Sequence, residues 1–247
     1  MRDRAREFLV EGTNGIEGAL ESGRRLEVLF VSPATSGGGE CQLDGLIKTA
    51  RAARVQSFEV SPEVMHTISD AETPPGAVAI APFVDVDPTQ LLDSGSDLFV
   101  VLAEVRDPGN LGTILRTARA AGAGGVFLTK GTVDVYNPKV VRASAGALFH
   151  VPVAREVAVP WVLAELGGRH IRRVAADPSA TASYDEVDMR GPSALVLGNE
   201  AWGLPGEAVA VVDERASIPM RASAESLNVG VAAAVFLFEA VRQRRRR

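Results

Sequence analysis

Residues Leu98–Val105 form a nearly continuous apolar run, which constrains the fold more than any other segment of the chain. Strands of this kind are buried on both faces, and they occur mainly in parallel sheets covered by helices. A helical pattern follows at Leu111–Ala121 and ends at Gly122, and Gly125–Leu128 has the pattern of a further strand. The second part of the chain is therefore predicted to be an α/β domain with a parallel sheet.

The alternation of strand and helix patterns extends over the whole chain. In the second part, further elements are expected at Val151–Val153, Ile171–Ala175, Ala194–Leu197, Ser217–Ile218 and, as a final helix, Val229–Arg242. In the first part they are expected at Phe8–Val10, Ile16–Leu20, Leu26–Val31, Leu43–Val55, Ser57–Val60 and Ala77–Ala81. We predict a small α/β domain at residues 1–83, a polar linker at 84–97 and a second domain at 98–247.

The composition is ordinary for a soluble globular protein, with 46% hydrophobic and 23% charged residues. A single cysteine, Cys41, excludes an intramolecular disulfide and favours a reducing compartment. The charged N-terminal segment lacks the apolar core of a secretory signal, and no apolar stretch is long enough for a membrane helix. We therefore expect a cytoplasmic location.

The charge distribution bears on nucleic-acid binding. Although the net charge is −5, residues 1–88 contain 8 Lys/Arg and 14 Asp/Glu, whereas residues 89–247 contain 18 and 17. Basic residues gather at Arg242 and Arg244–Arg247. This run could contact phosphate groups, and a solvated, frayed tail is the alternative.

Three predicted strands run directly into small polar residues, at Arg106–Asn110, Gly198–Glu200 and Arg221–Asn228. In open parallel sheets, ligands bind beyond the carboxyl ends of the strands. Each loop alone could be an ordinary turn, but three such loops together indicate a pocket. No P-loop or serine-hydrolase motif competes for this role, and the histidines and Cys41 lack metal-ligand spacing, so no metal is expected.

At these loops the sequence resembles the SpoU (TrmH-like) branch of the SPOUT methyltransferases. The motifs lie in the order and spacing of that family, at Asp107–Ala118, Leu195–Leu204, Ile218–Met220 and Ser226–Ala234. The resemblance implies a catalytic domain with a parallel sheet and a C-terminal trefoil knot, working as a homodimer. Residues 1–83 resemble, more loosely, the RNA substrate-binding domain that precedes the catalytic domain in members acting on ribosomal RNA.

The family resemblance also implies the reaction: methylation of a ribose 2′-hydroxyl in RNA, with S-adenosyl-L-methionine as the methyl donor. The additional N-terminal domain favours 23S ribosomal RNA as the substrate. A transfer-RNA 2′-O-methyltransferase is one alternative. A non-catalytic RNA-binding module in ribosome assembly is another, but the retained motif residues Asn110, Arg116, Glu200 and Asn228 argue against it.

Particular residues take roles from the family's motifs. The predicted cofactor-binding residues are Leu197, Gly198, Asn199, Ile218, Met220 and Leu227; core packing is the alternative for the large apolar ones. The predicted catalytic residues are Asn110, Arg116, Glu200, Ser226 and Asn228. Because arginine is protonated at all physiological pH values, we favour for Arg116 an electrostatic role on the target phosphate and hydroxyl over that of general base.

A further stretch resembles the family beyond the first motif. Lys139 and Arg142 are three residues apart, so they share one face if the segment is helical. They are predicted to contact RNA phosphates, and a surface charge pair is the alternative.

Overall fold

The computed structural model describes residues 2–35, 40–221 and 226–245, which divide into two compact units. Unit 1 comprises Met1–Val84 and Asp134–His150, and unit 2 comprises Asp85–Val133 and Val151–Arg247. The segment Asp134–His150, which we predicted within the second domain, thus packs with the N-terminal residues. Within the described ranges, no helix combines the length and the apolar character needed to cross a membrane.

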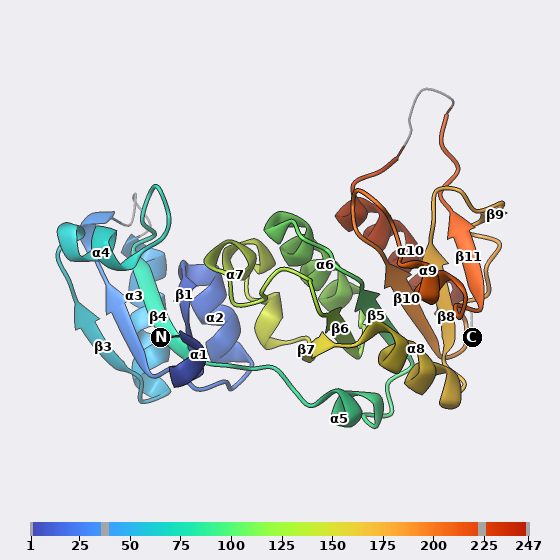
Figure 1. Cartoon of the computed structure of the whole chain (residues 1–247). Coiled ribbons are helices and arrows are strands. Elements are labelled where there is room, and N and C mark those ends of the chain that lie inside the picture. Colours follow the sequence, from blue (N-terminus) through green and yellow to red (C-terminus); the bar gives the residue numbers. More distant parts are fainter. Residues whose placement is uncertain (1, 36–39, 222–225, 246–247) are drawn as a thin grey trace. The chain divides into compact units, whose positions relative to one another are not determined.

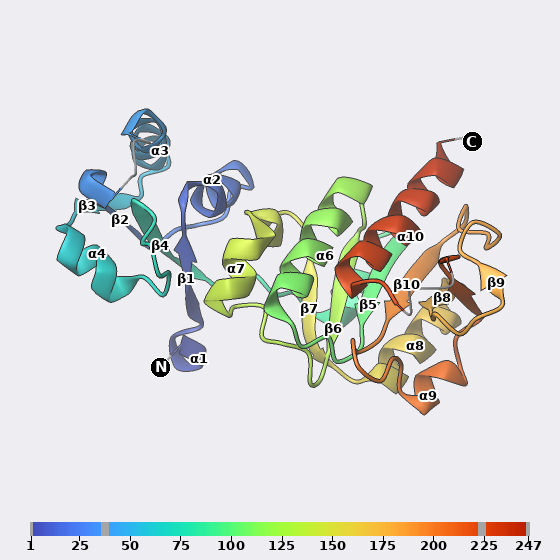
Figure 2. The same ribbon diagram turned by 90° about the horizontal axis from the view of Figure 1, so that it is seen from above.

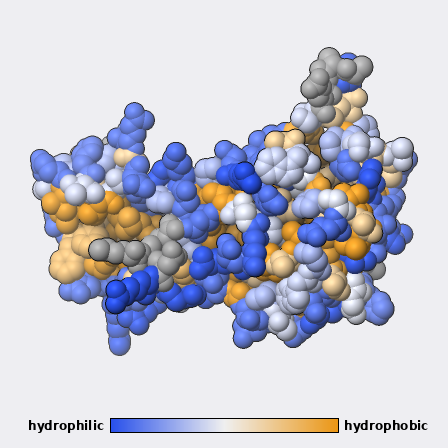
Figure 3. Space-filling model, in the orientation of Figure 1, coloured by the Kyte–Doolittle hydropathy of each residue, from blue (hydrophilic) through white to orange (hydrophobic). Residues whose placement is uncertain are grey.

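Unit 1 contains a four-stranded mixed sheet in the order β1-β4-β2-β3, in which only β2 and β3 run parallel (Figure 1). Its elements are α1 (Arg2–Ala5), β1 (Glu7–Glu11), α2 (Thr13–Glu21), β2 (Val28–Val31), η1 (Pro33–Thr35), α3 (Glu40–Ala52), β3 (Gln56–Glu59), α4 (Pro62–Ile68), β4 (Ala77–Pro82), α7 (Pro138–Ser144) and η2 (Ala147–Phe149). On the outer strand β3, Phe58 stacks on Phe30 and is 44% exposed. Figure 3 shows an apolar patch at its left, where unit 1 lies in the same orientation in Figure 1.

Aromatic and backbone contacts hold α7 and η2 in unit 1. The Tyr136 ring stacks on Phe83 with centroids 3.9 Å apart, and its hydroxyl accepts a hydrogen bond from the Val84 N–H. At Gly18 of α2, an added Cβ would lie 2.8 Å from the Cα of Gly146. Helix α7 ends at this contact, because Ala145 and Gly146 have φ values of 45° and 81°.

Unit 2 contains a seven-stranded, fully parallel sheet in the order β7-β6-β5-β10-β8-β11-β9. Its elements are α5 (Pro88–Leu92), β5 (Leu98–Leu102), α6 (Pro108–Ala121), β6 (Gly125–Thr129), β7 (Val153–Val157), α8 (Val159–Gly168), β8 (Arg172–Ala176), β9 (Ala182–Ser183), β10 (Ser193–Leu197), α9 (Gly206–Val209), β11 (Glu214–Ser217) and α10 (Val229–Arg244). The predicted parallel α/β fold is confirmed, and the trefoil knot stays a prediction.

Helices cover both faces of this sheet: α6 and α10 lie side by side on one face, and α8 lies on the other (Figure 2). Every residue of β5, β6 and β10 is buried, as the continuous apolar run predicted. Strand β5 ends at Leu102, short of the predicted Val105, because the chain turns at Glu104, where φ is 58°. The sequence pattern missed α8, β9 and α9.

The predicted linker packs onto unit 2. It contains α5, whose Leu91 and Leu92 are buried in the core beneath the sheet. An added Cβ at Gly125 would lie 2.2 Å from a Leu91 methyl group, so any larger residue here would require the Leu91 side chain to move. The proposed domain boundaries stay a prediction, but residues 88–92 are an ordered helix.

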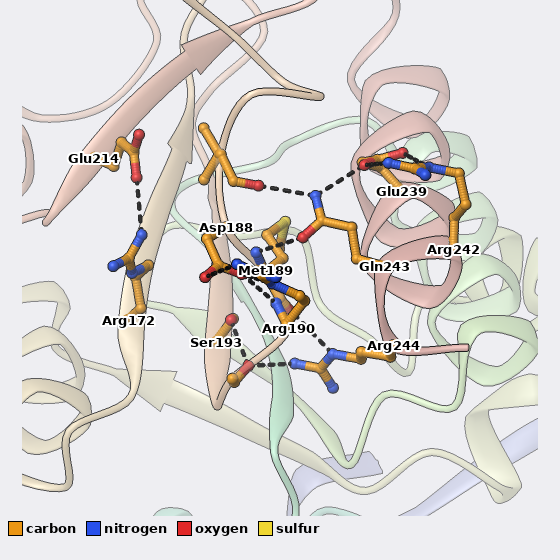
Figure 4. A network of polar contacts seen from close by, with 12 residues as sticks. Arg172, Asp188, Met189, Arg190, Ser193, Glu214, Glu239, Arg242, Gln243 and Arg244 are labelled. Atoms are coloured by element: carbon orange, nitrogen blue, oxygen red, sulfur yellow. Dashed lines mark hydrogen bonds and ion pairs between the residues drawn. The ribbon is translucent and has the colours of Figure 1, made fainter. Parts of the chain in front are cut away.

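The end of α10 is tied to the chain segments around Met189 (Figure 4). Arg244 donates hydrogen bonds to the Met189 and Gly191 carbonyls and forms an ion pair with Asp97 at 2.7 Å. Arg242 pairs with Glu239, at 2.6 Å. Arg244 thus joins α10 to other segments of unit 2, whereas the pair of Arg242 lies within α10. Neither sequence alternative anticipated these contacts; Arg246 and Arg247 lie outside the described residues.

Candidate active site

A cavity of about 1200 Å³ lies beyond the carboxyl ends of β5, β10 and β11, in unit 2. Strand β10 lies beside β5 although they are far apart in sequence, so the chain order of the sheet reverses here, as at known ligand sites. Every predicted catalytic and cofactor-binding residue except Arg116 lines it: Asn110, Leu197, Gly198, Asn199, Glu200, Ile218, Met220, Ser226, Leu227 and Asn228.

Three loops meet through the side chain of Asn110. Its Nδ2 donates a hydrogen bond to Glu200 Oε1 at 2.9 Å, and its Oδ1 accepts one from Asn228 Nδ2 at 2.7 Å. The amide of Asn110 therefore joins the loops after β5, β10 and β11 at one point on the cavity wall. Its orientation is fixed, because Glu200 accepts and Asn228 donates.

Glu200 stabilises the loop that leads into α6. It accepts hydrogen bonds from the backbone N–H groups of Arg106 and Asp107, at 3.3 and 3.4 Å. Burial acts to raise the pKa of Glu200, but the bonds from Asn110 and from these backbone groups outweigh it, so the pKa lies below its ordinary value. Glu200 is therefore a carboxylate at neutral pH, suited to accept hydrogen bonds.

Two helices begin at this junction. Asp107 caps α6 by accepting from the Asn110 N–H at 2.7 Å, with Pro108 in the first turn. Asn228 caps α10 by accepting from the N–H groups of Gly230 and Val231. The side chain of Asn228 is thus occupied by its own helix and by Asn110, which gives it a positioning role at the cavity.

The loop after β10 is a tight turn that closes on itself. Asn199 and Gly203 exchange two backbone hydrogen bonds of 2.9 Å, and the Asn199 side chain donates to the Glu104 carbonyl at 2.7 Å. An added Cβ at Gly198 would lie 2.3 Å from the Gly203 carbonyl carbon, so only glycine fits. The side chain of Asn199, predicted to bind cofactor, is used to hold this turn.

Arg116 lies exposed on α6 and does not line the cavity. Among the described residues, its guanidinium makes no hydrogen bond or ion pair, so it is available to a ligand. Its predicted catalytic role stays a prediction. Within the same described part of the chain, no group of His, Cys, Asp and Glu side chains could hold a metal ion.

The two predicted phosphate contacts lie on α7, in unit 1. Lys139 is exposed, whereas Arg142 is ion-paired with the buried carboxylate of Glu11. This pair ties α7 to β1, so Arg142 has a structural task whether or not it contacts RNA. Both RNA contacts stay predictions.

Sequence reasoning missed two residues at the rim of the cavity, Arg106 and Trp202. The Arg106 guanidinium carbon lies 4.7 Å from the centre of the Trp202 ring, and Trp202 is 54% exposed. The sequence feature that could have identified Trp202 is its place, as a tryptophan, within a loop of small and polar residues, Gly198–Gly203.

Comparison with known proteins identifies the family of this chain. The model of the SpoU rRNA Methylase family matches residues 97–238, more than half of the chain. The chain belongs to the SpoU rRNA methylase family. The model of the MRM3-like substrate binding domain matches residues 1–79. The family predicted from the three motifs is confirmed.

Relatives within and near this family match the chain over nearly its full length. The 23S rRNA (uridine(2479)-2′-O)-methyltransferase of Streptomyces viridochromogenes is 34% identical, covering 98% of this chain and 85% of the relative. The 23S rRNA (guanosine(2553)-2′-O)-methyltransferase RlmP of Bacillus subtilis is 31% identical, covering 96% and 89%. The structure of the SpoU methyltransferase AviRb from Streptomyces viridochromogenes, in complex with AdoMet, covers 100% of this chain and 94% of its own, with 32% identity and a TM-score of 0.85.

Proposed function

We propose that this protein transfers the methyl group of S-adenosyl-L-methionine to a ribose 2′-hydroxyl of 23S ribosomal RNA. The predicted enzyme class and methyl donor are confirmed by relatives named for this reaction and by the AdoMet complex of a similar structure. The observation that carries the proposal is the joining of Asn110, Glu200 and Asn228 on the wall of one large cavity. We place the reaction in the cytoplasm, which suits a chain with a single cysteine.

The lining of the cavity fits the methyl donor. The cavity has apolar side chains that can cover a purine ring, from Ile218, Met220 and Leu227. Gly198, which has no side chain, contributes backbone atoms to the lining. A volume of about 1200 Å³ is enough for a nucleoside-sized cofactor and part of an RNA nucleotide. When bound, S-adenosylmethionine supplies a methyl group already activated for transfer.

The side chains of the protein have to orient the ribose and help the 2′-hydroxyl lose its proton. Arg116 carries a permanent charge on an exposed helix face, so it can bind the target phosphate and lower the pKa of the hydroxyl. Asn110 holds the loop that leads into the same helix, and Glu200 and Asn228 fix Asn110. Ser226 lines the cavity and can hydrogen-bond the substrate.

Ribosomal RNA is favoured over transfer RNA because the two relatives that act on 23S rRNA align with almost the whole chain, N-terminal part included. The match of residues 1–79 to a substrate-binding domain points the same way. The two relatives methylate the 2′-oxygens of different nucleosides, a uridine and a guanosine, and they are nearly equal in identity to this chain. The base therefore has to be determined by mapping.

The dimer that the family resemblance implied is also part of the proposal. Val231 and Phe238, seven residues apart on α10, share one helix face and are 48% and 47% exposed. We infer that two copies associate through this face. Light scattering should give twice the mass of one chain, and Phe238→Asp should reduce it to one chain while Phe238→Leu should not; a wild-type monomer would contradict the dimer.

The function is tested with unmodified 23S rRNA transcribed in vitro and methyl-labelled S-adenosylmethionine. We expect label in one nucleotide, at a site that resists alkaline cleavage because its 2′-oxygen is blocked. Calorimetry with S-adenosylmethionine is the control for the alternative of a non-catalytic module, since absence of binding would rule out the enzyme. Label in a transfer-RNA transcript and none in 23S rRNA would establish the transfer-RNA alternative.

A further inference from the structure

Trp202 is an exposed tryptophan at the entrance of the cavity, in the loop after β10. Its 54% exposure is the highest among the large apolar side chains of the described residues. Burial of such a ring is strongly favourable, so a soluble surface usually keeps it covered. It lines the cavity together with Glu200, two residues earlier in the same loop, and Glu200 is hydrogen-bonded to Asn110.

The turn that carries Trp202 is rigid. The two backbone hydrogen bonds between Asn199 and Gly203 close it, and the Ala201 N–H donates to Asn199 Oδ1 at 2.8 Å. The Asn199 amide ties the turn to the Glu104 carbonyl. The indole is thus presented from a fixed support, which lowers the entropic cost of binding a ligand to it.

Arg106 lies over one face of the indole. Its guanidinium carbon is 4.7 Å from the ring centre, and Glu104 lies 3.5 Å from the same guanidinium. The backbone N–H of Arg106 donates to Glu200, so the support of the arginine is part of the junction that holds Asn110. The tryptophan and the arginine therefore form a stacked pair of flat groups, and Glu104 partly balances the charge of the arginine.

We propose that Trp202, flanked by Arg106, stacks on an unpaired RNA base next to the ribose that is methylated. Exposed aromatic rings and arginine planes are the groups that bind bases swung out of a helix, and stacking works for any base. The 2′-hydroxyl that is methylated has to reach the cavity, which it cannot do from inside a double helix. A base held on Trp202 would keep the neighbouring ribose beside Asn110. This proposal rests on the proposed function and names the binding surface of its RNA.

The first experiment compares methyl transfer to the 23S transcript by the wild type, Trp202→Ala and Trp202→Phe. Loss of a stacked base costs about 1–3 kcal/mol, so kcat/KM for RNA should fall by about 5- to 150-fold in Trp202→Ala. Trp202→Phe keeps an aromatic ring, so the fold-decrease in its kcat/KM should be less than one third of that in Trp202→Ala. The affinity for S-adenosylmethionine should be unchanged in both variants. Wild-type rates in Trp202→Ala, or equal losses in both variants, would overturn the proposal.

The second experiment does not depend on catalysis. The chain has two tryptophans, so Trp161→Phe leaves Trp202 as the single one. Its fluorescence should be quenched when the 23S transcript is added, whereas Trp202→Phe, in which Trp161 remains, should show no quenching beyond absorption by the RNA. Quenching without methyl transfer would refute the proposed function and keep the stacking surface; methyl transfer without quenching would refute the stacking surface alone.

A protein partner is the remaining explanation for an exposed tryptophan. If Trp202 covers a second copy of the chain, Trp202→Ala should lower the mass found by light scattering, and Trp202 fluorescence should change on dilution without RNA. Either result would overturn the assignment to RNA.

Discussion

The side-chain amide of Asn228 donates a 2.7 Å hydrogen bond to Asn110, a residue 118 positions earlier in the chain. The same Asn110 donates to Glu200. One amide therefore sets the relative positions of the loops that we assign to the ribose and to the methyl donor. A change at this residue should disturb both loops without reaching the core of the sheet.

We predict that Asn110→Asp is more harmful at neutral pH than Asn110→Ala. An aspartate would place a second carboxylate within hydrogen-bond distance of Glu200, and two such groups repel unless one is protonated. Asn110→Ala should lower kcat by about 100-fold through misplaced loops. The activity of Asn110→Asp relative to Asn110→Ala should rise as the pH falls from 8 to 6; a constant ratio would contradict the repulsion.

Replacement of Arg116 separates binding from chemistry. Because Arg116 lies outside the cavity wall, Arg116→Ala should keep the affinity for S-adenosylmethionine, measured by calorimetry. Methyl transfer should fall by about 100- to 1000-fold, the usual effect of removing an electrostatic stabiliser. Arg116→Lys keeps the charge and should retain part of the rate with the wild-type pH profile. A general base would instead give a profile shifted to lower pH in the lysine variant.

The ion pair of Glu239 predicts a pH-dependent stability. Hydrogen bonds from Arg242 lower the pKa of Glu239 below its ordinary value of 4.5, against the opposing effect of burial. A carboxylate with a lowered folded-state pKa stabilises the protein above pH 4.5, and the effect is lost as the pH falls through that lower value. Glu239→Gln should therefore lower the stability by about 1 kcal/mol at pH 7. The difference from the wild type should shrink below pH 4.5, as measured by urea unfolding.

The contact between Gly18 and Gly146 predicts opposite effects for two glycine replacements. Gly18→Ala would force its Cβ to within 2.8 Å of the Gly146 backbone and should destabilise unit 1 by about 1–3 kcal/mol. Gly45→Ala on α3 is the matched control, because a Cβ there meets nothing within 4 Å. It should stabilise the protein by about 0.5–1 kcal/mol, since alanine is the better helix former. Thermal unfolding of both variants checks the pair.

The sequence allowed prediction of the parts that depend on local pattern. The run at Leu98–Val105 indicated a doubly buried parallel strand, and Asp107-Pro108 and Asn228 carry the ordinary signals of helix starts. Because the carboxyl ends of parallel strands meet at one edge, the three polar loops could be placed together before the structure was known.

Pairings between distant residues could not be predicted. Nothing near Asn199 in the sequence indicates that its side chain holds the Glu104 carbonyl rather than a ligand. Arg244 was expected at the surface, but it reaches Asp97 and two carbonyl groups. The packing of α7 with β1 depends on Glu11 and Arg142, which are 131 residues apart. Such choices are decided by tertiary contacts, which periodicity does not record.

The ion pair between Arg244 and Asp97 affects how the protein folds while it is synthesised on the ribosome. Synthesis proceeds from the N-terminus, and domains fold as their residues emerge. Unit 1 has all its residues once His150 has left the exit tunnel, whereas Asp97, which precedes β5, pairs with Arg244, 147 residues later. Translation that stops before α10 would thus leave unit 1 complete and unit 2 without the helix that packs against α6. The cavity, which Asn228 and Val229 line, is therefore complete only after α10 has been synthesised.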